Sequence, residues 1–373
     1  GKQEITTMNI LTEVDELAPH EAWHIRAVRL PDGEHAEDWW IHEGRLYDQP
    51  IRGARDLPGG WALPGLVDAH AHLSLDFGGA RLCQGSDELI AANLEAHSKA
   101  GVLVVRDTGM VPGARIDRRL ARGPHILTAG RFLAPAGRYH APLYKAVGPE
   151  QLVAAALAEV ADGATWVKVI ADFPGPDGNW FAPRVNYAPD ALRALVSAAH
   201  DAGARVAAHV SGPFVAEVVR AGVDSIEHGP LIDADLLTVM AQRGTAWTPT
   251  LLTVAGVLDQ LAMTNSSIGA QAREALARLN ETLPLAAQFG VPILAGTDES
   301  PPGSVAREVA QLRRFGLSAV AALAAASTAA RAYLGLPAFS ASADLVTFAA
   351  DPRSDPEALA KPAAVVRAGR RIV

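Results

Sequence analysis

Histidine and aspartate side chains follow several apolar runs of this sequence, at positions where strands would end. His70 and His72 close the apolar run that begins at Gly65. Because side chains in a strand alternate between its two faces, residues two apart project to the same side. Two imidazoles at one strand end provide half of a site for a divalent metal such as zinc. Half-exposed strands also contain such a pair by chance, so a metal site needs further groups.

Further apolar runs carry polar residues that could complete such a site. Lys168 lies between β-branched neighbours, and His209, His228 and Asp298 each lie at or near the end of a run. Each alone could be a hydrogen-bonded polar group or a helix cap. Six such groups on five runs are better explained by a common site, because imidazole and carboxylate ligands suit zinc and related divalent metals.

The middle of the chain alternates strand-like and helix-like segments. Apart from the run that ends in His72, the strand-like runs are residues 101–107, 125–130, 165–171, 205–210, 224–228, 246–252 and 291–298. Eight such units predict a (β/α)8 barrel, whose catalytic groups come from the carboxyl ends of the strands. An open doubly wound sheet is the alternative, but no Gly-x-Gly-x-x-Gly follows the first strand.

Helical spacing of alanine and leucine is typical of the segments between these runs. Helices are expected at residues 86–100, 152–161, 191–202 and 236–243, and, after the last strand, at 304–315 and 318–334. The two ends of the chain instead contain short strand-like runs separated by turn signals. We therefore expect a small β-sandwich domain, residues 1–60 and 338–373, that flanks a barrel domain of residues 61–337.

The composition excludes several classes of protein. The 373 residues are 49% hydrophobic and 20% charged, and the formal net charge is −8, which argues against nucleic-acid binding. The single cysteine, Cys83, excludes an intrachain disulfide and fits a reducing compartment. No run approaches the ~20 apolar residues of a spanning helix, and no signal peptide is apparent. We expect a cytoplasmic enzyme with a small-molecule substrate, and a homo-oligomer is an open alternative to a monomer.

Six segments in a fixed order resemble the amidohydrolase superfamily, in its imidazolonepropionase-like and prolidase-like branch. They are residues 63–72, 101–109, 167–170, 206–209, 222–229 and 296–298. The resemblance covers the chain from about Trp61 on, and residues 343–346 and 367–370 match the family's return to its β domain. Each motif alone is loose, but together and in order they are specific.

The resemblance implies that these groups hold two divalent metal ions, of which zinc is the expected one. The ligands would be His70, His72 and Asp298 for the first metal, His209 and His228 for the second, and a carboxylated Lys168 bridging both. Two cations lower the pKa of a shared water and give a bridging hydroxide near neutral pH. Asp298 would then act as general base and afterwards as general acid. This predicts hydrolysis of an amide C–N bond in an N-acyl amino acid, a dipeptide or a cyclic amide.

The resemblance also implies roles in substrate binding for residues other than the metal ligands. His140 lies in a loop after the third strand that often faces the substrate in this branch, and Arg138 and Tyr139 are candidates for binding a substrate carboxylate. The Gly- and Pro-rich residues 172–186 are long enough for a lid. Residues 172–175 depart from the Gly-rich turn of prolidase-like members, which speaks against a dipeptidase.

Other activities stay open at this point. A mononuclear deaminase or an imidazolone-type ring hydrolase is the main alternative, and ester, lactone or phosphotriester hydrolysis would use the same metals. Deaminases of this fold usually lack the lysine of the fourth strand and carry a glutamate shortly after the histidine of the fifth. Here Lys168 is present, and Glu217 lies eight residues after His209. A binding protein without activity is disfavoured because all six ligand types are present.

Overall fold

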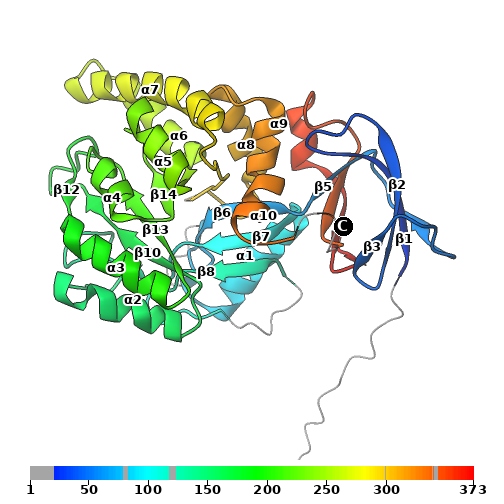
Figure 1. Ribbon diagram of the computed structural model, residues 1–373, viewed down its shortest axis with the longest axis horizontal. Coiled ribbons are helices and arrows are strands. Elements are labelled where there is room, and N and C mark those ends of the chain that lie inside the picture. Colours follow the sequence, from blue (N-terminus) through cyan, green and yellow to red (C-terminus); the bar gives the residue numbers. More distant parts are fainter. Residues whose placement is uncertain (1–20, 79–82, 117–122, 299, 338, 340–342) are drawn as a thin grey trace, which may run out of the picture.

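The chain folds into a (β/α)8 barrel and a small β-sandwich domain, as predicted from the sequence (Figure 1). The structure is a computed structural model that describes residues 21–78, 83–116, 123–298, 300–337, 339 and 343–373. Helices surround the barrel strands, and the β domain lies to one side of the barrel. Within the described residues, no helix is both long enough and apolar enough to cross a membrane.

Parallel strands in chain order make up the barrel. They are β6 (Leu66–Ala71), β7 (Val102–Asp107), β8 (His125–Thr128), β9 (Phe132–Leu133), β10 (Trp166–Ile170), β13 (Arg205–Val210), β14 (Ser225–His228) and β15 (Ala246–Thr248). β8 pairs with β7, and the short strand β9, which follows β8 in the chain, pairs with β10. Every residue of β6, β7, β10 and β14 is buried, which is typical of parallel strands covered on both faces.

The eighth strand, expected at residues 291–298, is reduced to a single bridge. Ile293 pairs in parallel with Trp247 of β15, and the Ala69 amide of β6 donates to the Ala295 carbonyl at 2.8 Å. The segment therefore closes the ring between β15 and β6. Most of its backbone hydrogen bonds run to β15 and β6, whereas the amides of Val291 and Ala295 bond to the carbonyls of Ala286 and Ala325 outside the sheet.

Ten helices lie within the described residues. They are α1 (Asp87–Lys99), α2 (Leu152–Ala161), α3 (Pro189–Asp201), α4 (Val215–Ala221), α5 (Ala234–Arg243), α6 (Leu251–Ala262), α7 (Ser267–Phe289), α8 (Val305–Arg314), α9 (Ala319–Ala325) and α10 (Thr328–Tyr333). Helices α1, α2, α3, α5 and α8 lie where the sequence predicts helices. Two short 3-10 helices cover Pro149–Gln151 and Pro356–Ala360.

Two expected elements differ from their sequence pattern: one strand is shorter, and one helix is divided in two. The strand expected to reach Leu252 ends at Thr248, because Thr250 adopts a left-handed φ of 46° and α6 begins at Leu251. The buried carboxylate of Glu308 accepts the amides of Leu251 and Leu252, which fixes the start of that helix. The helix expected over residues 318–334 is divided into α9 and α10, because Ser327, one of the two residues between them, leaves the helical conformation.

The β domain combines strands from both flanking parts of the chain. They are β1 (Trp23–Arg29), β2 (Ala36–His42), β3 (Arg45–Tyr47), β4 (Arg55–Asp56), β5 (Trp61–Pro64), β16 (Leu345–Phe348), β17 (Pro362–Arg367) and β18 (Arg370–Arg371). β5 pairs with β16 on one edge and with β1 on the other, so it joins the two parts of the domain. It then leads through Gly65 into β6, the barrel strand that ends in the His-x-His pair.

Candidate metal centre

Three of the predicted ligands form a compact group at one end of the barrel. The ligand atoms of His70, His72 and Asp298 lie within 4.8 Å of one another. Asp298 Oδ1 is 3.2 Å from Nε2 of His72 and 3.4 Å from Nε2 of His70. The strand period of two places both imidazoles on one side of β6, as the spacing predicts. Two imidazoles and a carboxylate with this spacing form a donor set for a divalent cation.

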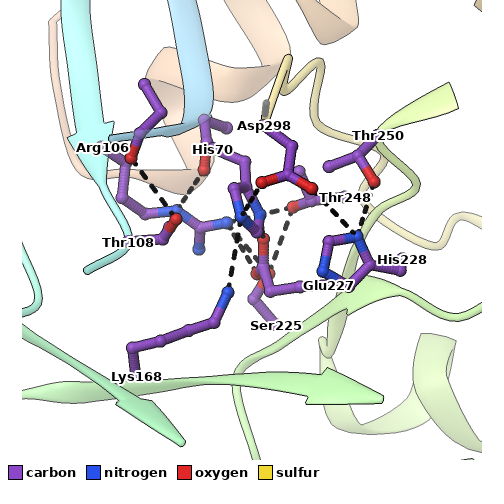
Figure 2. Close-up of polar contacts among 12 residues, drawn as sticks. His70, Arg106, Thr108, Lys168, Ser225, Glu227, His228, Thr248, Thr250 and Asp298 are labelled. Carbon is purple, nitrogen blue, oxygen red and sulfur yellow. Dashed lines mark hydrogen bonds and ion pairs between the residues drawn. The ribbon is translucent and has the colours of Figure 1, made fainter. Parts of the chain in front are cut away.

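Lys168 extends from the middle of β10 toward this group (Figure 2). Its Nζ lies 3.4 Å from Nε2 of His70, and the side chain is 1% exposed. Burial lowers the pKa of Lys168 to about 8, although Glu227 and Asp298 act in the opposite direction. The amine is therefore neutral to a larger extent than an ordinary lysine at the same pH. The neutral form of an amine is the form that attacks CO2.

His209 and His228 form a second pair of neighbouring imidazoles close to His70. Their ring centroids are 4.6 Å apart, and the His228 ring is 5.1 Å from that of His70. Burial lowers the pKa of His209 well below its usual value and that of His228 to about 3. Both imidazoles are therefore neutral near pH 7, which is the form that binds a metal.

One atom of His209 lacks the partner that a buried polar atom needs. Its Nε2 is buried and has no hydrogen-bond partner among the described residues. A buried polar atom left without a partner costs about 1–3 kcal/mol. Nδ1 of His228, by contrast, is 2.7 Å from Oγ1 of Thr250, so its other nitrogen faces the shared space. The donor set of this region therefore fits a metal ion.

Glu227 of β14 holds the first histidine in place. Its Oε2 is 2.5 Å from Nδ1 of His70, and its Oε1 accepts from Arg106 Nη2 at 2.8 Å and from the Ser225 hydroxyl at 2.5 Å (Figure 2). Burial alone would raise the pKa of Glu227, but Arg106 and His70 outweigh it and hold this pKa below its usual value. An ionised Glu227 accepts the Nδ1–H of His70 and leaves Nε2 for a metal, as in other metal sites.

Two buried aspartates organise the backbone around the ligands. Asp68 accepts from the amides of His70 and Thr297 and from the Thr297 hydroxyl, which joins the end of β6 to the segment that carries Asp298. Asp107 accepts from the amides of Leu73 and Gly109. Burial raises the pKa of both aspartates to about 6.

Backbone strain is concentrated at the same place. His228, Thr250 and Asp298 have φ values of 72°, 46° and 55°, in the left-handed region that disfavours residues other than glycine. Such a conformation costs on the order of 1–3 kcal/mol and is found most often at functional sites. Two of these three residues are predicted ligands, and the third contacts one of them.

No role for Glu227 or Arg106 is predicted from the sequence. Both are charged residues inside apolar strands, in Ser225–His228 and Val102–Asp107. Lys168 was singled out because it is a charged residue inside an apolar strand. The same pattern could therefore have identified Glu227 and Arg106. Their partners lie 157 positions away in one case and 121 in the other, so only the folded barrel reveals the pairing.

The three residues predicted to contact the substrate differ in what they contact around the predicted ligands. The Tyr139 ring lies 6.3 Å from the His209 ring, whereas His140 packs against Phe173 at 4.9 Å. Burial lowers the pKa of His140, although Asp298 acts in the opposite direction. Arg138 donates to three loop groups, Asn186 Oδ1 at 2.8 Å and the carbonyls of Phe173 at 2.9 Å and Arg184 at 2.6 Å.

The chain belongs to the amidohydrolase family, whose model matches residues 61–372. This family hydrolyses carbon–nitrogen bonds in small molecules and generally binds divalent metals, so the protein is a hydrolase of this class. The predictions of the superfamily and of a hydrolase are thus confirmed.

A relative of nearly the same length is the uncharacterized protein Rv2915c of Mycobacterium tuberculosis. It is 38% identical over 96% of this chain and 99% of its own. Among solved structures, a putative prolidase from Bifidobacterium longum matches with a TM-score of 0.79 at 24% identity, covering 95% of both chains. A Xaa-Pro dipeptidase with bound methionine matches with a TM-score of 0.78 at 23% identity over 94% of this chain and 99% of its own. The ochratoxinase of A. niger matches with 0.77 at 20%, over 95% of this chain and 96% of its own. At these identities the likeness of the solved structures shows the shared fold.

Proposed function

We propose that this protein is a binuclear metal hydrolase that cleaves the amide bond of an N-acyl amino acid, a dipeptide or a cyclic amide. Six candidate ligands converge at one end of the barrel strands, which supports a metal site of this size. The observation that carries the second metal is the buried Nε2 of His209, which lacks a hydrogen-bond partner among the described residues. A structural role for His209 would leave that atom unexplained.

The proposed ligands divide into two sets with one shared member. They are His70, His72 and Asp298 for one ion, His209 and His228 for the other, and Lys168 as a carbamate between them. Zinc is the proposed metal, because imidazole and carboxylate ligands suit it.

The surroundings of Lys168 support its carboxylation. Within the described part of the chain, Lys168 forms no ion pair, although it is almost fully buried. A buried ammonium without a counterion is costly. Addition of CO2 to the neutral amine, with loss of one proton, would give an anionic carbamate whose two oxygens could bind two cations.

Different side chains of the protein are proposed to have different roles in hydrolysis. Two divalent cations held by these residues would lower the pKa of a water molecule and polarise the scissile carbonyl. Asp298 would take up a proton from the attacking water and pass it to the leaving nitrogen, acting first as base and then as acid. Glu227 holds His70 in the tautomer that leaves Nε2 free, and Asp68 holds the backbone on which Asp298 depends. These groups are positioned before the substrate binds, as electrostatic catalysis requires.

Substrate contacts are proposed for Tyr139 and His140, which lie on the loop beside His209. Arg138, predicted as a carboxylate ligand, directs Nε and Nη2 to loop acceptors. This supports a role in holding the loops that carry the other two residues.

Metal content per chain tests the proposal directly. Protein expressed with zinc and bicarbonate would be measured by elemental mass spectrometry, together with Lys168→Ala and, as a control at an exposed lysine, Lys361→Ala. We expect about two metals per chain in the parent and in Lys361→Ala, and one or none in Lys168→Ala. A screen of N-acyl amino acids, dipeptides and cyclic amides would follow.

About one metal per chain that survives Lys168→Ala would contradict the binuclear site. It would favour the mononuclear alternative, since His70, His72 and Asp298 alone form a three-ligand group. The substrate screen would then turn to deamination and to imidazolone-type ring opening.

Three expectations of the sequence stay predictions. The first is the division into a β domain of residues 1–60 and 338–373 and a barrel domain of residues 61–337. The others are the cytoplasmic location and the choice between a monomer and a homo-oligomer. For the first, β5 at Trp61–Pro64 shares the sheet of the β domain and continues into the barrel.

A further inference from the structure

Aromatic rings surround one side of the proposed metal centre. The rings of Trp180, Tyr139 and Phe173 lie 6.0, 6.3 and 6.5 Å from the ring of His209. His140 completes the group and is exposed, whereas the other three rings are partly buried. We call these four residues the aromatic box.

The members of the box contact one another mainly edge to face. Phe173 meets His140 at 4.9 Å with an interplanar angle of 88°, and Trp180 at 5.3 Å with 78°. Tyr139 meets Phe173 at 5.5 Å with 66°. Aromatic pairs prefer such tilted arrangements to a face-to-face sandwich.

Two loops carry the box, and Arg138 binds them together. Tyr139 and His140 follow β9, whereas Phe173 and Trp180 belong to the hairpin of β11 (Asp172–Phe173) and β12 (Arg184–Val185). Arg138 donates to the carbonyls of Phe173 and Arg184, one on each strand of that hairpin. Both loops are therefore held in one arrangement.

The hairpin is also fixed relative to the metal ligands. The buried carboxylate of Asp172 accepts from the amides of Ser211 and Gly212 and from the Ser211 hydroxyl, at 2.8–3.0 Å. These residues directly follow β13, the strand that carries His209. The box thus keeps a defined position beside His209, as a substrate subsite requires.

We propose that the aromatic box binds a planar aromatic group of the substrate beside the scissile amide, so that the substrates are aryl-bearing amides. This inference rests on the proposed metal hydrolase function, because His209 provides the reference point for the scissile bond. An aryl group gains ring contacts that a methyl group of the same substrate cannot make. The box contains no lysine, arginine, aspartate or glutamate, so it suits an apolar group.

Hydroxamates test the box without catalysis, because they bind zinc through two oxygens and differ only in the attached group. Calorimetry would compare benzohydroxamate, acetohydroxamate and cyclohexanecarbohydroxamate on the zinc-loaded enzyme. We expect benzohydroxamate to bind about tenfold more tightly than the other two. Trp180→Ala should reduce this preference to about twofold and leave the acetohydroxamate affinity unchanged. Trp40→Ala, at a partly buried tryptophan of β2, should keep the full preference.

The other outcomes each overturn a defined part of the inference. Equal affinities for benzohydroxamate and acetohydroxamate would overturn the box while leaving the metal centre intact. Equal affinities for the phenyl and cyclohexyl compounds would overturn the aromatic character of the substrate group. A chain that holds no zinc, or a zinc-loaded chain that binds none of the three, would overturn the proposed function and this inference with it. An undiminished preference in Trp180→Ala would show that the box is not the site of the ring.

Discussion

Oε2 of Glu227 lies 2.5 Å from Nδ1 of His70, and both side chains are buried in the barrel interior. The same carboxylate is paired with Arg106, so three residues from β14, β6 and β7 form one continuous contact (Figure 2). The imidazole is thereby oriented with Nε2 toward Lys168 and Asp298. The orientation of a proposed ligand thus depends on residues that bind no metal themselves.

Glu227→Gln should weaken zinc binding by about 10- to 100-fold, the usual effect of losing a partner of a metal-bound histidine. The amide can donate to Nδ1 of His70 and so permit the wrong tautomer. Competition with a chromophoric chelator at fixed pH would measure the change. Glu281→Gln, at an exposed position of α7, is the control and should bind zinc like the parent. Equal affinity in both variants would refute the orienting role.

Arg106→Met should lower the free energy of unfolding of the metal-free protein by about 3–5 kcal/mol, because it leaves the Glu227 carboxylate buried without its partner. Urea unfolding followed by circular dichroism would measure it. The double variant Arg106→Met with Glu227→Gln should be more stable than Arg106→Met alone, since no unpaired charge stays buried. Arg243→Met, at an exposed arginine of α5, should change little. A double variant less stable than Arg106→Met would argue against this account.

Gly296→Ala should disturb the metal centre through a steric contact. A Cβ at this position would lie 2.6 Å from Cβ of His70 and 2.6 Å from Cγ2 of Thr248. His70 must therefore shift, and we expect a loss of zinc affinity together with a lower melting temperature. Gly256→Ala in α6 is the matched control, because nothing lies within 4 Å of its added Cβ. That control should be neutral or stabilised by up to about 1 kcal/mol, since alanine favours the helix. Tight zinc binding by Gly296→Ala would contradict the expected displacement.

His97 should make the stability of the fold depend on pH. Burial lowers its pKa from 6.5 to about 3, so between these values the unfolded chain binds a proton that the folded chain does not. The stabilisation is therefore complete above pH 6.5 and is lost as the pH falls, by up to about 1.4 kcal/mol per pH unit. Urea midpoints of the parent between roughly pH 5 and pH 7.5 would show this slope.

His97→Gln should flatten that slope, because glutamine does not titrate and can still accept the Gly303 amide that now bonds to Nδ1 at 3.2 Å. His35→Gln, at an exposed histidine, is the control. An unchanged slope in His97→Gln would assign the pH dependence to other groups.

The barrel was predictable from the sequence, and so was the grouping of His70, His72 and Asp298, because both follow from local patterns. His70, His72 and Asp298 end apolar runs, and a barrel brings such ends to one face. The irregular form of the eighth strand was not predictable, since its Ala295 amide bonds to the carbonyl of Ala325, which lies outside the barrel strands. The helix α6 was missed because Leu251 and Leu252 continue the apolar pattern of β15, and only the buried Glu308 shows where the helix begins.

The pairing of β5 with β16 also has a consequence for the order of synthesis. β5 leads directly into the strand that carries His70 and His72, but its partner on one edge, β16, is made only when synthesis reaches Leu345–Phe348. The ring itself closes through Ile293, so the first two proposed ligands leave the ribosome long before their surroundings exist. Completion of the proposed metal centre and of the sheet that anchors it is therefore a late event in the life of the nascent chain.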